Sequence, residues 1–256
     1  MYRQSSVSGA RATLVFLHGL GNSGRTWDEV AAKLPDDINL VIVDLLGFGD
    51  SPQPNWAVYS AKTQAKSLAK TLLANGVFGK VILVGHSMGG LVAIEFAKRF
   101  PLLVDSLVLC SPPLYSVDPS DDKKLFVQRD EQLRRLYEFA IKRPENIITV
   151  ATLAKRYGFM NPAFDVQALN IDAYVAALRA NILDQTAMRD LIGLKKPISI
   201  VYGTLDPFVI GSNIKRAQER SEYIQVTRFI GGHEIIGSYV DRIVKVIDQQ
   251  LKQDNV

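Results

Sequence analysis

Short runs of apolar and β-branched residues recur along the chain and alternate with stretches in which apolar residues return at helical spacing. The runs predict strands at residues 13–18, 39–44, 81–84, 106–111, 198–203 and 224–230. The spaced stretches predict helices at residues 27–34, 60–75, 91–100 and 239–251. Because the strands are apolar almost throughout, we expect an α/β fold whose mostly parallel sheet is covered by helices on both faces.

The segment 112–195 interrupts this alternation. It shows no convincing strand and three helix-like stretches, at residues 131–142, 145–157 and 172–185. A structureless loop of that length is uncommon inside a compact domain, so we interpret the segment as a helical insertion that returns to the sheet at Ile198. Residues 1–111 and 196–256 then form the core. Insertions at the carboxyl edge of a sheet often act as lids over a site.

The most informative motif follows the apolar run that begins at Val81. The sequence Gly-His-Ser-Met-Gly-Gly, residues 85–90, has the GxSxG pattern of a nucleophile elbow between a strand and a helix. Such a turn forces Ser87 toward positive φ, and the flanking Gly85 and Gly89 remove Cβ atoms that would collide there. The pattern alone occurs by chance, but its position between a strand and a helix predicts an exposed serine nucleophile. The Met88 N–H would then lie at a helix N-terminus, which favours negative charge.

A serine nucleophile needs a base, and the chain has only three histidines. His86 adjoins Ser87, and neighbouring strand residues point to opposite faces, so we expect it to serve packing. His18 ends the first clear strand. His233 follows the last strand in a Gly-Gly-His-Glu loop and is the best candidate for the base.

The acid that orients the base is expected at another strand end. Asp206 follows the strand at 198–203 in Gly-Thr-Leu-Asp-Pro, and Asp118 is a second possible acid. We prefer Asp206, because the order Ser87, Asp206, His233 is the order of nucleophile, acid and base that follows a nucleophile elbow.

The composition argues against several other classes of protein. A net charge of +4 with scattered Lys and Arg residues gives little support for nucleic-acid binding. The histidines show no metal-ligand spacing, so we expect no metal and no cofactor. Cys110 lies in an apolar run and is expected to pack as a small hydrophobe. The apolar stretch before His18 is too short for a signal peptide or a membrane span, so we expect a cytoplasmic protein without stable membrane insertion.

Taken together, these motifs resemble those of the α/β-hydrolase fold superfamily. The matching pieces span almost the entire chain in the family order: residues 18–21, Asp44 with residues 47–51, residues 85–90, Asp206 and residues 232–233. The resemblance implies that the Leu20 and Met88 backbone N–H groups form an oxyanion hole and that residues 112–195 are the cap. The chain departs from the family before residue 13, where the first strand or hairpin must be short or missing.

The function expected from the triad is hydrolysis of carboxylic esters through an acyl-enzyme, as in a carboxylesterase or lipase-like serine esterase. The expected partner is a small-molecule ester with an apolar acyl group, and the oligomeric state stays open. We expect most of the large apolar side chains of the insertion in the core or against the sheet, and a few in an acyl pocket; they are Phe126, Tyr137, Phe139, Tyr157, Phe159, Met160, Phe164 and Tyr174.

Three alternatives stay open at this point. Hydrolysis of a carbon–carbon bond uses the same triad; in relatives that do so a tryptophan often follows the histidine, whereas this chain has Glu234. Residues 19–24 also form GxGxxG after a strand, and Asp44 ends the next strand, as in a dinucleotide-binding fold. That interpretation leaves the spacing of Ser87, Asp206 and His233 unexplained. The third alternative is a ligand-binding member of the fold that does not catalyse.

Overall fold

A seven-stranded sheet forms the centre of the computed structural model, which describes residues 3–115, 124–158, 160–166 and 171–253. The strands follow the order β1-β3-β2-β4-β5-β6-β7 across the sheet. Every neighbouring pair is parallel except β1 and β3. The strands are β1 (Arg3–Ser5), β2 (Thr13–Leu17), β3 (Asn39–Val43), β4 (Val81–His86), β5 (Val104–Cys110), β6 (Ile198–Gly203) and β7 (Ile224–Phe229).

The predicted mostly parallel sheet is therefore confirmed. Its edge strand β1 lies in the stretch before residue 13. β1 has only three residues, paired antiparallel to β3, and its residues are exposed or half-buried. Such a strand buries too little apolar surface to produce a recognisable hydrophobic run. The described residues before residue 13 thus contribute one short strand to the sheet.

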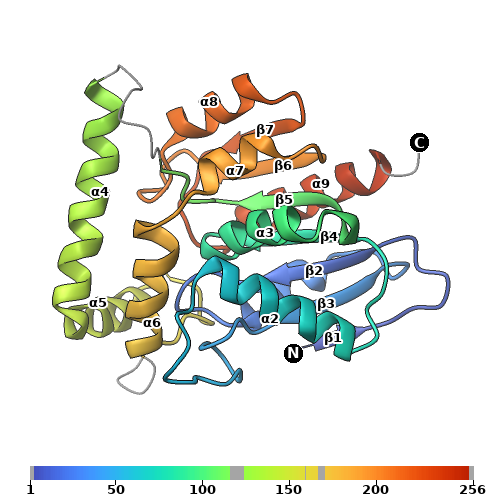
Figure 1. Cartoon of the computed structure of the whole chain (residues 1–256), viewed down its shortest axis with the longest axis horizontal. Helices are drawn as coiled ribbons and strands as arrows, with labels where there is room; N and C mark the ends of the chain where they lie inside the picture. Colours follow the sequence, from blue (N-terminus) through green and yellow to red (C-terminus); the bar gives the residue numbers. More distant parts are fainter. Residues whose placement is uncertain (1–2, 116–123, 159, 167–170, 254–256) are drawn as a thin grey trace.

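Helices cover both faces of the sheet, as Figure 1 shows. On one face, every second residue of the strands, for example Val15 and Leu83, packs in one apolar core. The helices of this core are α2 (Ala61–Ala74), α3 (Met88–Arg99), α7 (Ala187–Gly193) and α8 (Gly211–Arg220). On the other face, alternate residues such as Phe16 and Ile82 pack with the 3₁₀ turn Gly24–Trp27, α1 (Asp28–Ala31) and α9 (Ser238–Gln253). This alternation is why the strands are apolar almost throughout.

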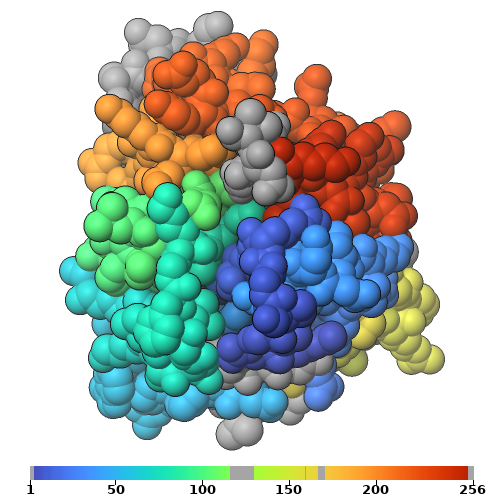
Figure 2. All heavy atoms as spheres, turned by 90° about the vertical axis from the view of Figure 1, so that its right-hand side faces the viewer, coloured from blue at the N-terminus to red at the C-terminus, as the bar shows by residue number. Residues whose placement is uncertain are grey.

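Elements from the first and last parts of the chain, α1 and α9, lie side by side on the second face. Seen from the side of the molecule opposite α4, the blue N-terminal segments lie beside the red helix α9 (Figure 2). Lys33 Nζ lies 2.6 Å from Asp241 Oδ1, which joins the end of the α1 region to α9. Both side chains are exposed, so this ion pair contributes little stability beside the apolar contacts of the same helices.

The segment between β5 and β6 is helical in its described residues and contains no strand there. We call residues 112–195 the helical insertion. Its helices are α4 (Lys124–Lys142), α5 (Pro144–Arg156), α6 (Ile171–Leu178) and α7, with a π-helical turn at Arg179–Leu183 between the last two. The three predicted helices are present, but the third breaks at the π-helical turn. Because β5 leads into the insertion, α4, α5 and α6 lie toward the carboxyl edge of the sheet (Figure 1).

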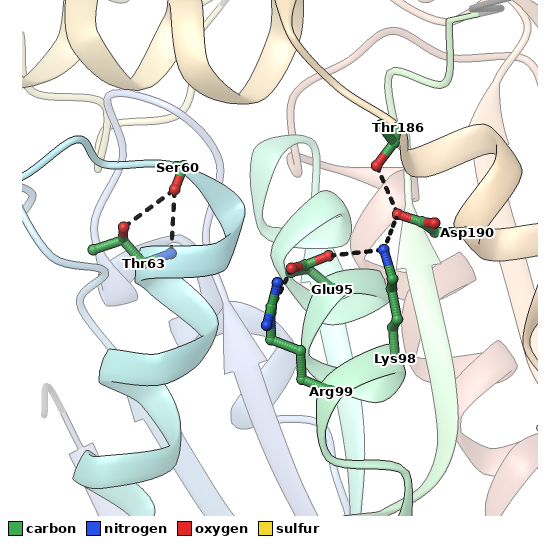
Figure 3. A network of polar contacts seen from close by, with 7 residues as sticks. All are labelled: Ser60, Thr63, Glu95, Lys98, Arg99, Thr186 and Asp190. Carbon is green, nitrogen blue, oxygen red and sulfur yellow. Dashed lines mark hydrogen bonds and ion pairs between the residues drawn. The ribbon is translucent and has the colours of Figure 1, made fainter.

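Polar contacts fix the point at which the insertion returns to the core. Lys98 Nζ on α3 lies 2.9 Å from Asp190 Oδ2 on α7, and Thr186 Oγ1 donates a hydrogen bond of 2.7 Å to the same carboxylate oxygen (Figure 3). Glu95 pairs with Lys98 and with Arg99 on the next turn of α3. This network holds α7 against α3 while α4 and α5 extend away from the sheet (Figure 1).

One helix that packs on the sheet lies outside the predicted set. The helix α8 between β6 and β7 was not predicted, because only a few apolar residues, such as Ile214 and Ala217, mark its buried side.

Among the described residues, no helix has both the length and the apolar composition needed to cross a membrane.

Candidate active site

The turn between β4 and α3 has the strained geometry that the motif predicts. Ser87 adopts φ 51° and ψ −119°, which is a left-handed conformation that a non-glycine residue rarely adopts. A Cβ atom on Gly85 would lie 2.5 Å from the carbonyl oxygen of Gly89, and a Cβ atom on Gly89 would collide with the carbonyl oxygen of Leu17 in β2. The glycines therefore let α3 start directly against the sheet, with Met88 as its first residue.

Asp206 and His233 lie on the loops after β6 and β7 and meet at the same edge of the sheet. His233 Nδ1 donates a hydrogen bond of 2.7 Å to Asp206 Oδ2, and the Phe208 N–H donates one of 2.9 Å to Asp206 Oδ1. The Asp206 side chain is fully buried. The contact assigns the His233 proton to Nδ1 and leaves Nε2 as an acceptor.

Each member of this pair shifts the pKa of the other. Burial favours the neutral forms, so it raises the pKa of Asp206 and lowers the pKa of His233. Attraction between the two charges and their hydrogen bond act in the opposite direction and prevail. The pKa of Asp206 is therefore lowered and the pKa of His233 is raised relative to their ordinary values. Asp206 is a carboxylate at neutral pH.

The other two histidines are buried, and neither is placed to accept a proton readily. Burial, followed by the neighbouring His233, lowers the pKa of His86 to about 3. Burial lowers the pKa of His18 to about 4, although the Gly19 carbonyl and Asp44 act against it. His18 Nε2 accepts a hydrogen bond of 2.9 Å from the Leu45 N–H, which fixes the loop after β3.

His86 does more than the packing expected of it. Its Nε2 lies 2.9 Å from the backbone carbonyl oxygen of His233, to which it donates, and the two rings lie 4.9 Å apart between centroids. The loop of His233 folds back over the end of β4, so that the strand's last side chain supports it. Sequence reasoning missed this contact because it depends on the path of a loop far along the chain.

The Asp44 carboxylate accepts hydrogen bonds from the protein's own backbone. The Gly24 N–H donates a hydrogen bond of 2.7 Å to Asp44 Oδ1, and the Asp50 N–H donates one of 3.1 Å to Asp44 Oδ2. Because Asp44 itself follows β3, its Oδ1 ties the loop after β2 to the loop after β3, and its Oδ2 holds the loop after β3 in shape. The position that a dinucleotide-binding fold uses to bind a ribose serves here to shape the protein itself.

A cavity of about 350 Å³ lies between the sheet edge and the helical insertion. Ser87, His233 and Leu20 line it from the core side. None of the hydrogen bonds of the described residues joins the Ser87 hydroxyl to His233, although both residues line this cavity. The insertion contributes an apolar wall made of Leu136, Tyr137, Phe139, Ala140, Ile147, Val150, Ala151, Met160, Phe164, Tyr174, Leu178 and Ile182.

More of the insertion's large side chains line this cavity than the sequence led us to expect. Of the eight large side chains singled out in the insertion, Tyr137, Phe139, Met160, Phe164 and Tyr174 line it. Tyr157 is exposed instead. The side chains of Phe126 and Phe159, and the alternative acid Asp118, lie outside the part of the chain whose side chains are described.

The insertion also contacts two of the loops that carry candidate site residues. The Asn161 N–H donates a hydrogen bond of 3.2 Å to Glu234 Oε2, and Asn161 Nδ2 donates one of 2.9 Å to the Ile235 carbonyl. The Asp165 N–H donates one of 2.7 Å to the carbonyl oxygen of Gly21. Residues 160–166 therefore join the His233 loop to the loop after β2.

Comparison with known proteins identifies the class. The family model for the alpha/beta hydrolase fold matches residues 12–235, so the chain belongs to the α/β-hydrolase fold family. A thermophilic esterase from Thermogutta terrifontis superposes with a TM-score of 0.76 at 20% identity, over 98% of this chain and 92% of that one, which shows the shared fold.

Two curated relatives resemble parts of the chain. An uncharacterized protein of Mycobacterium tuberculosis is 40% identical over 111 residues, which are 43% of this chain and 32% of that protein. Lipase 3 of a Moraxella species is 28% identical over 166 residues, 61% of this chain and 52% of the lipase. The chain thus matches about a third of the length of the mycobacterial relative.

Among the described residues, no group of three or more His, Cys, Asp or Glu side chains is arranged to hold a metal ion.

The close approach of α3 to the sheet yields a stability prediction. Gly89→Ala should lower the free energy of unfolding by about 1–3 kcal/mol, because the new methyl group meets the backbone of β2, which cannot move aside. Urea denaturation measures the difference. Gly193→Ala is the matched control, because nothing lies within 4 Å of a Cβ atom there. Equal stability of the two variants would contradict the steric interpretation of the turn.

Proposed function

We propose that the protein is a serine hydrolase that cleaves carboxylic esters through an acyl-enzyme, with Ser87 as nucleophile, His233 as base and Asp206 as the group that orients the base. The observation that carries the proposal is the 2.7 Å hydrogen bond between His233 Nδ1 and Asp206 Oδ2, made by a histidine that lines the same cavity as Ser87. Family membership and the similarity to a lipase support a hydrolase. The order of the three residues supports the triad.

In the first step His233 Nε2 removes the Ser87 hydroxyl proton while the oxygen attacks the ester carbonyl carbon. The imidazole becomes an imidazolium, which the buried Asp206 carboxylate stabilises. The carbonyl oxygen gains the negative charge of the tetrahedral intermediate. When the intermediate collapses, the carbon–oxygen bond to the alcohol breaks, and His233 returns its proton to the leaving alkoxide.

The oxyanion would be bound by the Leu20 and Met88 N–H groups. Met88 is the first residue of α3, where the helix dipole favours negative charge. Neither N–H is a donor in the hydrogen bonds found among the described residues, so both are available to a ligand. Each such donor contributes on the order of 3 kcal/mol to transition-state stabilisation in comparable sites. In the second half of the reaction water replaces the alcohol, and the same groups release the acid.

We also propose that the helical insertion, residues 112–195, acts as a cap through α4, α5 and α6, and that its apolar wall binds the acyl group of the substrate. The cavity side chains contributed by α4, α5 and α6 are almost all apolar. Removing a hydrocarbon chain from water into such a wall is favourable by about 25 cal/mol per Å² of buried apolar surface. A cap of this kind would also exclude water from the acyl-enzyme until the alcohol leaves.

The first prediction about activity concerns the nucleophile. Ser87→Ala should lower kcat for p-nitrophenyl butyrate by at least about 10⁴-fold, because it removes the hydroxyl that forms the acyl-enzyme in the proposed mechanism. It should also abolish covalent labelling by a fluorophosphonate, which mass spectrometry detects. Ser8→Ala, at an exposed turn, is the control and should keep both properties. Turnover or labelling retained by Ser87→Ala would remove Ser87 from this role, and a wild-type protein without turnover would mark a member of the fold that does not catalyse.

The second prediction concerns the orienting acid. Asp206→Asn should lower kcat by about 10⁴-fold, because an amide can donate to Nδ1 and hold the wrong tautomer of His233. The base works only when neutral, so activity rises with pH through the pKa of His233. The Asp206 charge raises that pKa. The acidic limb of the kcat/KM profile should therefore move to lower pH in the variant.

Residual activity in a sensitive fluorogenic ester assay, followed from pH 4 to pH 9, measures both effects. Asp36→Asn, on an exposed loop, removes the same charge at a distance and serves as the control. A limb that stays in place, or moves to higher pH, would contradict the assignment of Asp206 as the partner of the catalytic base.

A further inference from the structure

Glu234 is the one carboxylate among the described residues that line the cavity. It follows His233 directly, and its Oε2 accepts the Asn161 N–H at 3.2 Å. No hydrogen bond found in the described part of the chain uses its Oε1. The triad hypothesis gives this side chain no task, and a half-buried carboxylate beside an apolar wall gains from a donor that takes the place of water.

We propose that Glu234 selects esters whose alcohol portion carries a hydrogen-bond donor, either a hydroxyl or a protonated amine, close to the ester oxygen. This inference rests on the proposed ester hydrolysis at Ser87 and names the class of alcohol that the site accepts. The ligand chemistry is a donor group that meets the free oxygen of a carboxylate.

The position of Glu234 points to the alcohol and not to the acyl group. In the proposed mechanism His233 protonates the leaving alkoxide, so the alcohol must lie beside the imidazole. Glu234 is the next residue of the same loop and also lines the cavity. The acyl group, in contrast, has the apolar wall of the helical insertion. The cavity therefore has one apolar side and one side with a carboxylate, which matches an ester of a hydrocarbon acid with a polar alcohol.

The environment of Glu234 explains why a donor would be distinguished from an alkyl group of the same size. Burial raises the pKa of Glu234, and attraction to His233 and the Asn161 N–H offset only part of this effect. A carboxyl group in such surroundings gains more from one further donor than it would in water. A site with a buried hydrogen-bonding group disfavours a substrate that leaves that group unpaired.

A simpler role for Glu234 is to hold Asn161, and hence residues 160–166, against the His233 loop. That role would affect all substrates alike. Glu234→Gln separates the two possibilities, because the amide oxygen can still accept the Asn161 N–H while the NH₂ group turns a donor toward the cavity. A protonated amine on the substrate then meets a donor on the protein, and a substrate hydroxyl, which can still accept from the NH₂ group, loses the stronger bond to a charged acceptor.

The experiment compares butyrate esters in pairs of nearly equal size. The first pair is 2-hydroxyethyl and propyl butyrate, and the second is 2-(dimethylamino)ethyl and 3-methylbutyl butyrate, with acid release followed in a pH-stat at pH 7. In the wild-type chain at least one donor ester should exceed its alkyl partner in kcat/KM, and Glu234→Gln should lower that ratio by about tenfold or more. Ratios cancel any general loss of activity. Glu219→Gln, exposed on α8, is the matched control and should leave the ratios unchanged.

Each outcome decides the question. A lowered ratio in the first pair identifies a hydroxyl as the preferred donor, and one in the second pair identifies a protonated amine. Equal ratios in the wild-type chain and in Glu234→Gln, with turnover that depends on Ser87, would overturn this inference alone and leave Glu234 with the structural role. Turnover that does not depend on Ser87 would overturn the proposed function, and this inference with it.

Discussion

The direct contact between the start of α3 and the sheet is the constraint on which the site depends. Gly85 and Gly89 have no Cβ atoms, and backbone atoms occupy the space that such atoms would need. Only this close seating lets a strand turn into a helix within one residue and holds Ser87 at a positive φ. The strain is local, while the buried residues of β4 and α3 that resist its release are many. A rigid core thus keeps the backbone of one residue, Ser87, in an unfavourable conformation at the sheet edge.

Much of the fold could be predicted from the sequence, because apolar patterns report directly on burial. The parallel strands, α2, α9 and the helical character of the insertion follow from such patterns. β1 and α8 could not be found in this way, since a short edge strand and a mostly polar helix leave little apolar signal. The limit was the amount of buried surface in each element and not its importance for the fold.

For the candidate site, the sequence could indicate which residues stand at strand ends but not what else reaches them. The meeting of Asp206 with His233 was predicted, because the carboxyl ends of parallel strands share one edge. The contact of His86 with the His233 carbonyl, and that of Asn161 with Glu234, depend on loop paths that no periodicity encodes. The GxGxxG pattern shows the converse error: local spacing matched a nucleotide site, whereas Asp44 binds the protein's own loops.

The bonds that residues 160–166 make, to Gly21 on one side and to the loop of His233 on the other, link parts that lie far apart in the sequence. An exchange of insertions between relatives would therefore do more than reshape a binding surface. A foreign segment without an equivalent bridge would leave the loop after β2 and the loop of His233 without their common support. Chimeras in this family would need to retain this short bridge even when every helix around it is replaced.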